Sequence, residues 1–156
     1  MEALPAPAAG PRPYCTFLLG DGLFAVEAAL VQSVALPPPL TPLPHAPAAV
    51  RGYANLRGQV LLVLDLGRLL GRAATADGPD TRLVVFQPAL GDPFGVLVDC
   101  IGDVAFLRPD QIEAGGPDDA AASDGVVLGV GKLDRELVAL LDARKFLGGL
   151  ARALAT

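Results

Sequence analysis

The chain contains two copies of one pattern, and this internal repeat constrains the fold more than any other feature of the sequence. FAVEAALVQSV begins at Phe24 and FGVLVDCIGDV begins at Phe94, and each places an aliphatic residue seven positions and a valine ten positions after its phenylalanine. Further along, LVLDLGRLLG from Leu62 matches ALLDARKFLG from Ala139. Matching landmarks in the same order predict two similar small units packed side by side.

Short apolar runs separated by Gly and Pro turns indicate strands rather than helices. Their spacing of about 8–12 residues is typical of all-β barrels, here with about five strands in each unit. A single long helix is expected at residues 142–154, because Asp142 is a good N-cap and the apolar residues that follow share one face. The expected strands cover residues 14–19, 23–26, 30–36, 59–64, 82–87, 94–98, 101–107, 126–130 and 137–141.

The predicted organisation is a leader, one β domain and a terminal helix. Residues 1–13 are rich in Pro and Ala and are expected to be disordered. Residues 14–150 form the domain, with two intertwined barrel subdomains at roughly 14–80 and 81–141 and the helix at 142–154. The proline-rich stretch PPPLTPLPHAP and the acidic stretch 108–125 are expected to be loops.

Composition argues against nucleic acid and against insertion into a membrane. The chain has 17 acidic and 12 basic residues, without the clustered basic surface that phosphates require. Residues 28–50 carry no formal charge, but prolines at six positions would deprive a lone membrane helix of its backbone hydrogen bonds.

No motif indicates catalysis, a metal or a cofactor. Cys15 and Cys100 lack metal-ligand spacing and are expected to be reduced and partly buried. His45 is the single histidine and is expected to lie exposed in the proline-rich loop. No Gly-rich phosphate-binding motif is present. We therefore predict no catalytic residue, no metal ligand and no cofactor site.

Three aspartates follow apolar strands and leave one alternative open. Asp65 and Asp142 occupy equivalent repeat positions that favour helix capping, and Asp99 is expected to hold the turn before Ile101. Paired carboxylates can also perform acid–base chemistry or bind a metal. A small enzyme or ligand sensor that uses a groove between the barrels therefore remains the alternative from another class.

Several segments in order resemble the CheW family of chemotaxis scaffold proteins over residues 14 to about 150. They are FLLGDGLFAVEAALVQSV, TPLPHAPAAVRGYANLRGQVLLVLDLGRLLG, LVVFQPALGDPFGVLVDCIGDV and GVGKLDRELVALLDARKFL. The resemblance implies an all-β fold of two SH3-like five-stranded barrels side by side, with no active site. It also implies a cytoplasmic adaptor, recruited to membrane-bound receptor arrays, with two partners: the cytoplasmic tip of a chemoreceptor and the regulatory domain of a CheA-type histidine kinase. An adaptor of a non-flagellar pathway, in surface motility or biofilm formation, is the nearer alternative.

The resemblance also implies a receptor-binding groove where the barrels meet. Carried over to this sequence, the groove includes Val31, Val34, Gly52, Arg57, Leu83, Gly95, Ile101 and Val104. Ser33 and Gly58, beside Val34 and Arg57, complete the predicted partner-binding set.

The stretch NLRG carries its own expectations. Gly52 and Gly58 are expected to let the backbone turn tightly, and Asn55 suits the turn through side-chain hydrogen bonds. Arg57 is expected either to bind a partner carbonyl or carboxylate or to clamp the two barrels together. Ser33 stands where many family members carry Glu, so a carboxylate partner for Arg57 is either absent or supplied by the receptor.

Overall fold

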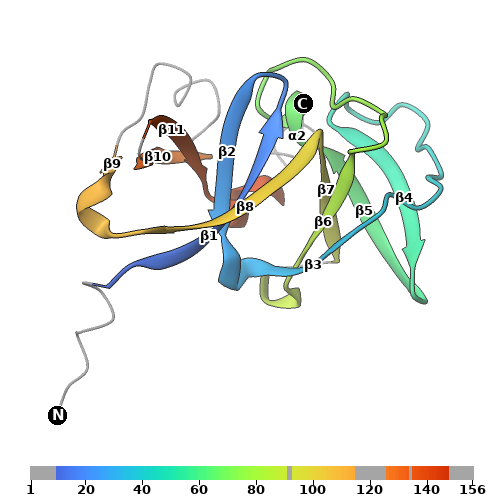
Figure 1. Cartoon of the computed structure of the whole chain (residues 1–156). Helices are drawn as coiled ribbons and strands as arrows, with labels where there is room; N and C mark the ends of the chain where they lie inside the picture. The colour runs from blue at the N-terminus through green and yellow to red at the C-terminus, as the bar shows by residue number, and fades with distance from the viewer. Residues whose placement is uncertain (1–9, 91–92, 115–125, 134, 148–156) are drawn as a thin grey trace, which may run out of the picture.

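Two β-sheets make up the computed structural model, which describes residues 10–90, 93–114, 126–133 and 135–147 (Figure 1). Sheet 1 contains, in spatial order, β8 (Cys100–Leu107), β1 (Arg12–Leu19), β2 (Gly22–Glu27), β11 (Glu136–Leu141), β10 (Val127–Leu133) and β9 (Ile112–Ala114). Sheet 2 contains β3 (Val31–Ala35), β6 (Arg82–Phe86), β7 (Phe94–Val98), β5 (Gln59–Asp65) and β4 (Val50–Leu56). The all-β prediction is confirmed.

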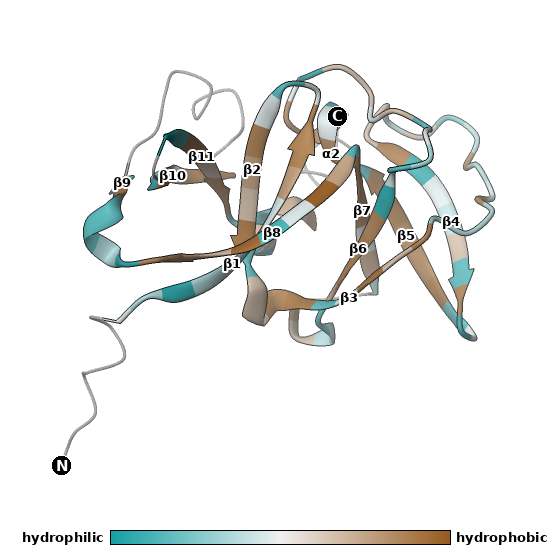
Figure 2. Ribbon diagram, in the orientation of Figure 1, coloured by the Kyte–Doolittle hydropathy of each residue, from teal (hydrophilic) through white to brown (hydrophobic). Residues whose placement is uncertain are grey.

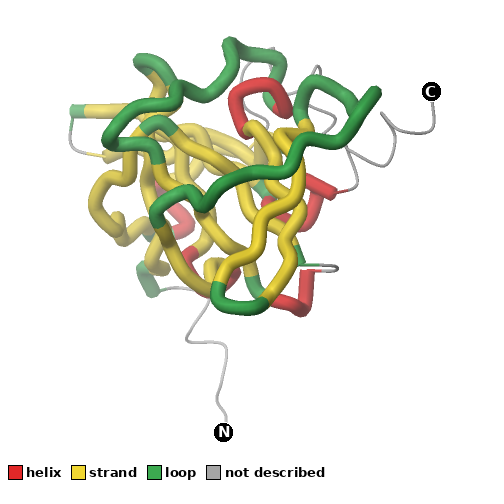
Figure 3. Tube along the Cα trace, turned by 90° about the vertical axis from the view of Figure 1, so that its right-hand side faces the viewer, coloured by secondary structure: helices red, strands yellow, loops and turns green. Residues whose placement is uncertain are grey.

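Helical structure in the described residues is limited to single turns, and Figure 3 shows these turns at the margins of the sheets. They are η1 (Ala28–Leu30), α2 (Leu66–Leu69), η2 (Pro88–Leu90), η3 (Pro109–Gln111) and η4 (Ala143–Lys145). Most of the helix predicted at 142–154 lies outside the described residues. In the part of the chain that is described, no helix is both long and apolar enough to cross a membrane.

Three element predictions need correction. The leader was expected to reach residue 13, but β1 begins at Arg12, and Pro13 pairs with Phe106 on β8; residues 1–9 lie outside the described part. The strand β4 was not predicted, because Gly52 and Asn55 interrupt its apolar pattern. The stretch 108–125 was expected to be all loop, yet it contains η3 and the short edge strand β9.

The internal repeat is visible in the pairing of the strands. Leu62 of β5 lies opposite Phe94 of β7 in a parallel pair, and Ala139 of β11 lies opposite Phe24 of β2 in the other parallel pair. These four residues are the ones at which the repeated sequence segments begin. The order β8-β1-β2-β11-β10 in sheet 1 therefore corresponds strand for strand to β3-β6-β7-β5-β4 in sheet 2.

The boundary predicted near residue 80 separates the two repeats but does not separate the two sheets. Each repeat contributes its first hairpin to one sheet and its later strands to the other. The chain crosses between sheets at η1, which joins β2 to β3, and again at Asp99, which alone joins β7 to β8. The subdomains 14–80 and 81–141 are thus not packing units, because hydrogen bonding pairs strands across the repeats.

Three hydrophobic clusters explain why several strands read as continuous apolar runs. One cluster lies between the sheets and contains residues from both, one is formed by strands of sheet 2, and one by strands of sheet 1. On β6, Val84 and Phe86 point into the cluster between the sheets, whereas Leu83 and Val85 point into the cluster of sheet 2. Burial on both faces removes the usual polar alternation, and Figure 2 shows β6 and β7 as mostly hydrophobic ribbons.

Phe86 sits at the centre of the cluster between the sheets. Its ring stacks on Phe94 at 5.1 Å between centroids and meets the edge of Phe146 at 5.7 Å. Such offset and edge-on pairs add to the free energy gained by burying the rings. The sheets are therefore joined by a shared apolar core as well as by the two crossovers.

Candidate functional site

The two sheets each end in an edge strand that immediately follows a crossover, β3 in sheet 2 and β8 in sheet 1. Within the described residues each pairs with one neighbour only, so it presents a free edge of backbone groups. Because β3 and β8 occupy equivalent places in the two repeats, the same sequence pattern builds both edges.

Five predicted site residues lie on these two strands. Val34 is 43% exposed and Val104 is 52% exposed, although both are aliphatic. Val31 and Ile101 are half-buried and pack against the core between the sheets. Ser33 is half-buried on β3. We call this set, Val31, Ser33, Val34, Ile101 and Val104, the edge-strand surface.

Arg57 and Gly58 form the tight turn of the β4–β5 hairpin. Both have positive φ, 53° for Arg57 and 83° for Gly58, which matches the type I′ turn that suits the twist of a hairpin. The Asn55 side-chain oxygen accepts a hydrogen bond from the Gly58 N–H at 3.0 Å. The expected roles of Asn55 and Gly58 in the turn are therefore confirmed.

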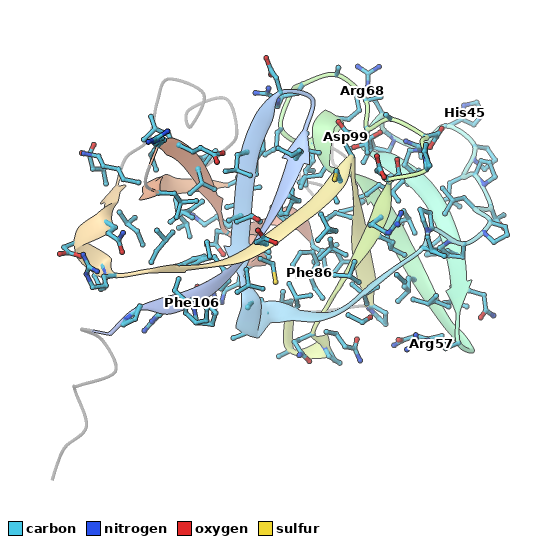
Figure 4. The ribbon with its side chains drawn as sticks, viewed as in Figure 1. His45, Arg57, Arg68, Phe86, Asp99 and Phe106 are labelled. Carbon is cyan, nitrogen blue, oxygen red and sulfur yellow. The ribbon has the colours of Figure 1, made fainter. Side chains whose placement is uncertain are left out.

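The side chain of Arg57 projects from the end of this hairpin, and Figure 4 shows it well away from the labelled Asp99 and Phe106. Arg57 is exposed, and its guanidinium forms no ion pair with any residue that the structure describes. The alternative in which Arg57 clamps the two barrels together has no contact to support it.

Three residues assigned to the groove are buried inside sheet 2 instead. Leu83 is 0% exposed in the cluster of sheet 2. Gly95 is buried, and a Cβ there would lie 2.9 Å from Leu83 Cδ1. Gly52 has a φ of 132°, and a Cβ there would lie 2.3 Å from the Thr41 carbonyl oxygen. Burial keeps the Leu83 side chain from a partner, and Gly52 and Gly95 have no side chain to offer, so none of the three adds a side-chain contact to the edge-strand surface; their place in a partner site stays a prediction.

Asp65 and Asp142 are capping residues, as predicted from their equivalent positions. Asp65 accepts a hydrogen bond from the Arg68 N–H at 3.1 Å at the start of α2, and Asp142 accepts one from the Arg144 N–H at 3.0 Å at the start of η4. Burial alone would raise the pKa of Asp65. The hydrogen bonds from Thr75, Arg68 and Arg51 outweigh that effect and hold the pKa below its ordinary value.

The remaining candidates for chemistry are His45, the side chains that could bind a metal, and Asp99. His45 is exposed in the proline-rich loop, as predicted from the sequence. Its φ is 61°. Among the residues that the structure places, no three His, Cys, Asp or Glu side chains are grouped closely enough to hold a metal ion. Asp99 accepts hydrogen bonds from the N–H groups of Gly20 and Ala76, so its side chain holds the β1–β2 turn and the loop at Ala76 rather than the turn before Ile101 that was expected.

Sequence reasoning missed two exposed apolar residues beside the edge-strand surface. Phe106 on β8 is 62% exposed and Leu36, immediately after β3, is 68% exposed. The signal was present in the period of two, since Val104 and Phe106 point to the same side of a predicted strand. The apolar surface of the two edges is therefore larger than the predicted set.

Comparisons with known proteins bear on the family and the fold. Residues 13–150 match the family model described as the CheW-like domain. The chemotaxis protein CheW of Rhizobium meliloti (strain 1021) is 34% identical over 104 residues, which span 67% of this chain and 66% of that protein. The probable chemotaxis protein CheW of Rhizobium etli is 29% identical over 136 residues, 85% of each.

Two further likenesses widen the comparison. Protein FrzA of Myxococcus xanthus is 40% identical over 84 residues, 54% of this chain and 52% of that protein. The crystal structure of the scaffolding protein TtCheW from Thermoanaerobacter tengcongensis has a TM-score of 0.78 at 24% identity, covering 87% of this chain and 92% of that one. At that identity the structural likeness shows the fold.

Proposed function

The chain belongs to the CheW family of chemotaxis scaffold proteins, and from this premise we propose that it is a non-enzymatic adaptor. In this proposal it couples the cytoplasmic tip of a chemoreceptor to the regulatory domain of a CheA-type histidine kinase. It acts in the cytoplasm and is recruited to receptor arrays at the membrane. The family assignment supports the adaptor role, and the partners and location are our inference from it.

The exposed valines of the edge-strand surface are the observation that carries this proposal. Val34 and Val104 stand at equivalent positions of the two repeats, with 43% and 52% of their surface open to solvent. Each follows a half-buried aliphatic residue, Val31 or Ile101, that packs against the core between the sheets. A receptor segment that covers both strands would bury this apolar area and gain free energy by removing it from water.

Arg57 provides a second, charged contact in the proposal. Its exposed guanidinium has five donors in a fixed plane that suits a partner carboxylate. Ser33 provides no carboxylate within the chain, and Arg57 has no acidic partner among the described residues. We therefore assign the missing carboxylate to the partner protein.

Charge substitutions on the edge-strand surface test the proposal directly. Val34→Asp and Val104→Asp would each force a carboxylate into a dry contact, so we expect binding of a receptor-tip fragment to weaken by at least about tenfold, equal to 1.4 kcal/mol. Kinase binding should change less. The measurement is titration calorimetry with the receptor fragment and the kinase regulatory domain separately.

Leu137→Asp is the matched control, since Leu137 is 65% exposed on β11, away from both β3 and β8. It carries the same change of charge and should leave receptor affinity within about twofold of the unmodified protein. Equal loss in all three variants, or no loss in the two valine variants, would remove the edge-strand surface from the proposal.

An adaptor of a non-flagellar pathway is the second candidate, and the 40% identity to FrzA over 84 residues favours considering it. The physical role of the surface is then the same, but the receptor and kinase belong to another pathway. Deleting the gene distinguishes the two: loss of swimming chemotaxis supports the first, whereas normal swimming with altered surface motility or biofilm formation supports the second.

A further inference from the structure

We propose that Asp99, together with the segment 72–77, fixes the angle between the two sheets and thereby the placement of β3 relative to β8. We call residues 72–77 the strap. Asp99 acts here as a positioning residue, since it lies outside the edge-strand surface. The effect on partner binding rests on the proposed function, but the effect on the sheets does not.

Asp99 connects three segments at the point where the chain leaves sheet 2 for sheet 1. It is the single residue between β7 and β8. One carboxylate oxygen accepts a hydrogen bond from the Gly20 N–H, in the β1–β2 turn of sheet 1, at 2.6 Å. The other accepts one from the Ala76 N–H in the strap at 2.8 Å. The backbone N–H of Asp99 also donates to the Leu18 carbonyl oxygen at 3.0 Å.

The strap is anchored firmly to sheet 2. The Thr75 hydroxyl donates to the Asp65 carboxylate at 2.9 Å, and the Thr75 N–H donates to the same carboxylate at 3.0 Å. Arg51 on β4 bridges Asp65 at 3.0 Å and Asp77 at 2.9 Å. Asp65 is 1% exposed, so the charge-assisted hydrogen bonds to its carboxylate are shielded from water, whereas the pair with Asp77 lies at the surface.

The strap also reaches sheet 1 at a second point. The Arg72 guanidinium lies 5.3 Å from the centre of the Phe24 ring on β2, within range of a cation–π interaction. The same guanidinium lies 3.9 Å from the Asp21 carboxylate in the β1–β2 turn. Asp99 and Arg72 thus hold the strap to the β1–β2 hairpin, while Asp65 and Arg51 hold it to sheet 2.

At the other crossover the Gln87 N–H donates to the Leu30 carbonyl oxygen at 2.9 Å and the Gln87 side chain donates to the Val31 carbonyl oxygen at 3.3 Å, and both bonds run to the end of β6 in sheet 2. There η1 joins β2 to β3 through Ala28, Ala29 and Leu30, whose side chains have no hydrogen-bonding groups. Figure 1 shows the β1–β2 turn and the β7–β8 junction near the top of the view, with η1 near the bottom. Because β3 starts at one crossover and β8 at the other, a change in sheet angle displaces one edge strand relative to the other.

We call the contacts of Asp99 and the strap with both sheets the joint. Distance measurements between spin labels test the joint in the free protein, without any partner. Labels at Gln59 on β5 and Glu136 on β11, both exposed, report on the separation of the two sheets after Cys15 and Cys100 are replaced by alanine. Asp99→Ala removes both acceptors, and Asp99→Asn replaces one acceptor with a donor. We expect both variants to broaden and shift the distance distribution measured by pulsed electron resonance.

Asp110→Asn is the matched control, because it makes the same change at an exposed carboxylate in η3 that pairs with Arg108 at 3.1 Å, outside the strap and both crossovers. The distance distribution should stay unchanged in this variant. Arg72→Met, which keeps the apolar stem and loses the charge, should shift the distribution in the same direction as Asp99→Asn. It also keeps the test available if Asp99→Ala does not fold.

If the distance distribution is unchanged in folded Asp99→Asn and Arg72→Met, the proposal that the joint fixes the angle between the sheets is wrong, whatever the protein binds. A shifted distribution supports it. In the binding assay we expect the Asp99 variants to weaken receptor-tip affinity by about 2- to 30-fold, with Asp110→Asn near the unmodified value. If the distance between the sheets shifts in the variants but no receptor fragment binds even the unmodified protein, the proposal about the joint is supported and the proposed function is wrong.

Discussion

At the scale of single residues, two glycines with positive φ have different reasons to be glycine. A Cβ at Gly52 would collide with the Thr41 carbonyl oxygen at 2.3 Å, whereas a Cβ at Gly58 would meet nothing within 4 Å. Gly52 therefore permits a close approach between the proline-rich loop and β4, where Thr41 and Tyr53 exchange hydrogen bonds of 2.8 and 2.9 Å. Gly58 only supplies the turn conformation.

Alanine substitution at the two glycines should separate these effects. Gly58→Ala should lower the free energy of unfolding by about 1–2 kcal/mol, the cost of placing a Cβ in the left-handed region. Gly52→Ala adds a collision with backbone that cannot rotate away, so we expect about 4 kcal/mol or more. Urea unfolding measures both, and equal losses would contradict the close approach.

Asp65 makes stability depend on pH. Because its pKa in the folded protein is lowered, the carboxylate stabilises the fold at pH values above the unfolded pKa of about 3.9. This contribution is lost as the pH falls through the lower pKa of the folded state. We expect Asp65→Asn to be less stable than the unmodified protein at pH 7 and to show a flatter decline below about pH 4.

Asp77→Asn is the control for this pH effect, since Asp77 shares Arg51 with Asp65 but its side chain is 78% exposed. A surface ion pair of this kind contributes about 0–1 kcal/mol, so its stability should follow the unmodified protein across pH 3–7 in urea titrations. Parallel pH profiles for Asp65→Asn and the unmodified protein would show that the buried carboxylate is not the responsible group.

At the scale of elements, the turn of the β4–β5 hairpin is less stable than its conformation allows, because it contains Arg57 instead of a residue that favours positive φ. Type I′ turns favour Asn-Gly, and Arg57 adopts a φ of 53° that is unfavourable for a long side chain. Arg57→Asn should therefore raise the free energy of unfolding by about 0.5–1 kcal/mol while removing the guanidinium proposed to contact a partner.

Calorimetric melting and binding titrations check this pair of effects together. Arg57→Lys is the control, since it keeps the charge and the unfavourable φ but lacks the planar fork of donors. It should leave stability unchanged and weaken partner binding less than Arg57→Asn. A turn variant that gains stability and binds both partners normally would remove Arg57 from the proposed contacts.

Local patterns predicted most strands, and their failures have identifiable causes. Runs such as 82–87 and 137–141 carry strand-forming residues between clear turns, and β6 and β11 lie there. The strand β4 was not predicted because RGYANL mixes polar residues with a glycine. The role of that glycine depends on its contact with Thr41, which lies outside the strand in the sequence. Contacts of that kind are absent from a strand's own sequence.

At the scale of the whole molecule, the repeat was predictable but the exchange of hairpins between sheets was not. The repeated segments identify equivalent strands, yet nothing in them states that Phe24 pairs with Ala139 rather than with Leu62. The same gap affects the site. Val34 and Leu83 are both aliphatic strand residues, and only the pairing order places Val34 on an exposed edge and Leu83 inside sheet 2.

The exchanged hairpins and shared core predict that the two sheets unfold together. Phe86, Phe94 and Phe17 join strands of both sheets in one cluster, so neither sheet can lose its packing without exposing the other. The sequence provides a probe for each sheet: Tyr14 lies in the cluster of sheet 1 and Tyr53 lies on β4 of sheet 2, and the chain has no further tyrosine and no tryptophan.

Fluorotyrosine incorporation would give each sheet its own fluorine resonance, which Tyr53→Phe would assign. We expect both resonances to change at the same urea concentration and with the same slope, as a single cooperative transition requires. Separate transitions would mean that the sheets are independent units joined by crossovers alone. In that case the cluster between them contributes little to stability, and truncating Phe86 to alanine would cost far less than the about 3–5 kcal/mol typical of a buried phenylalanine.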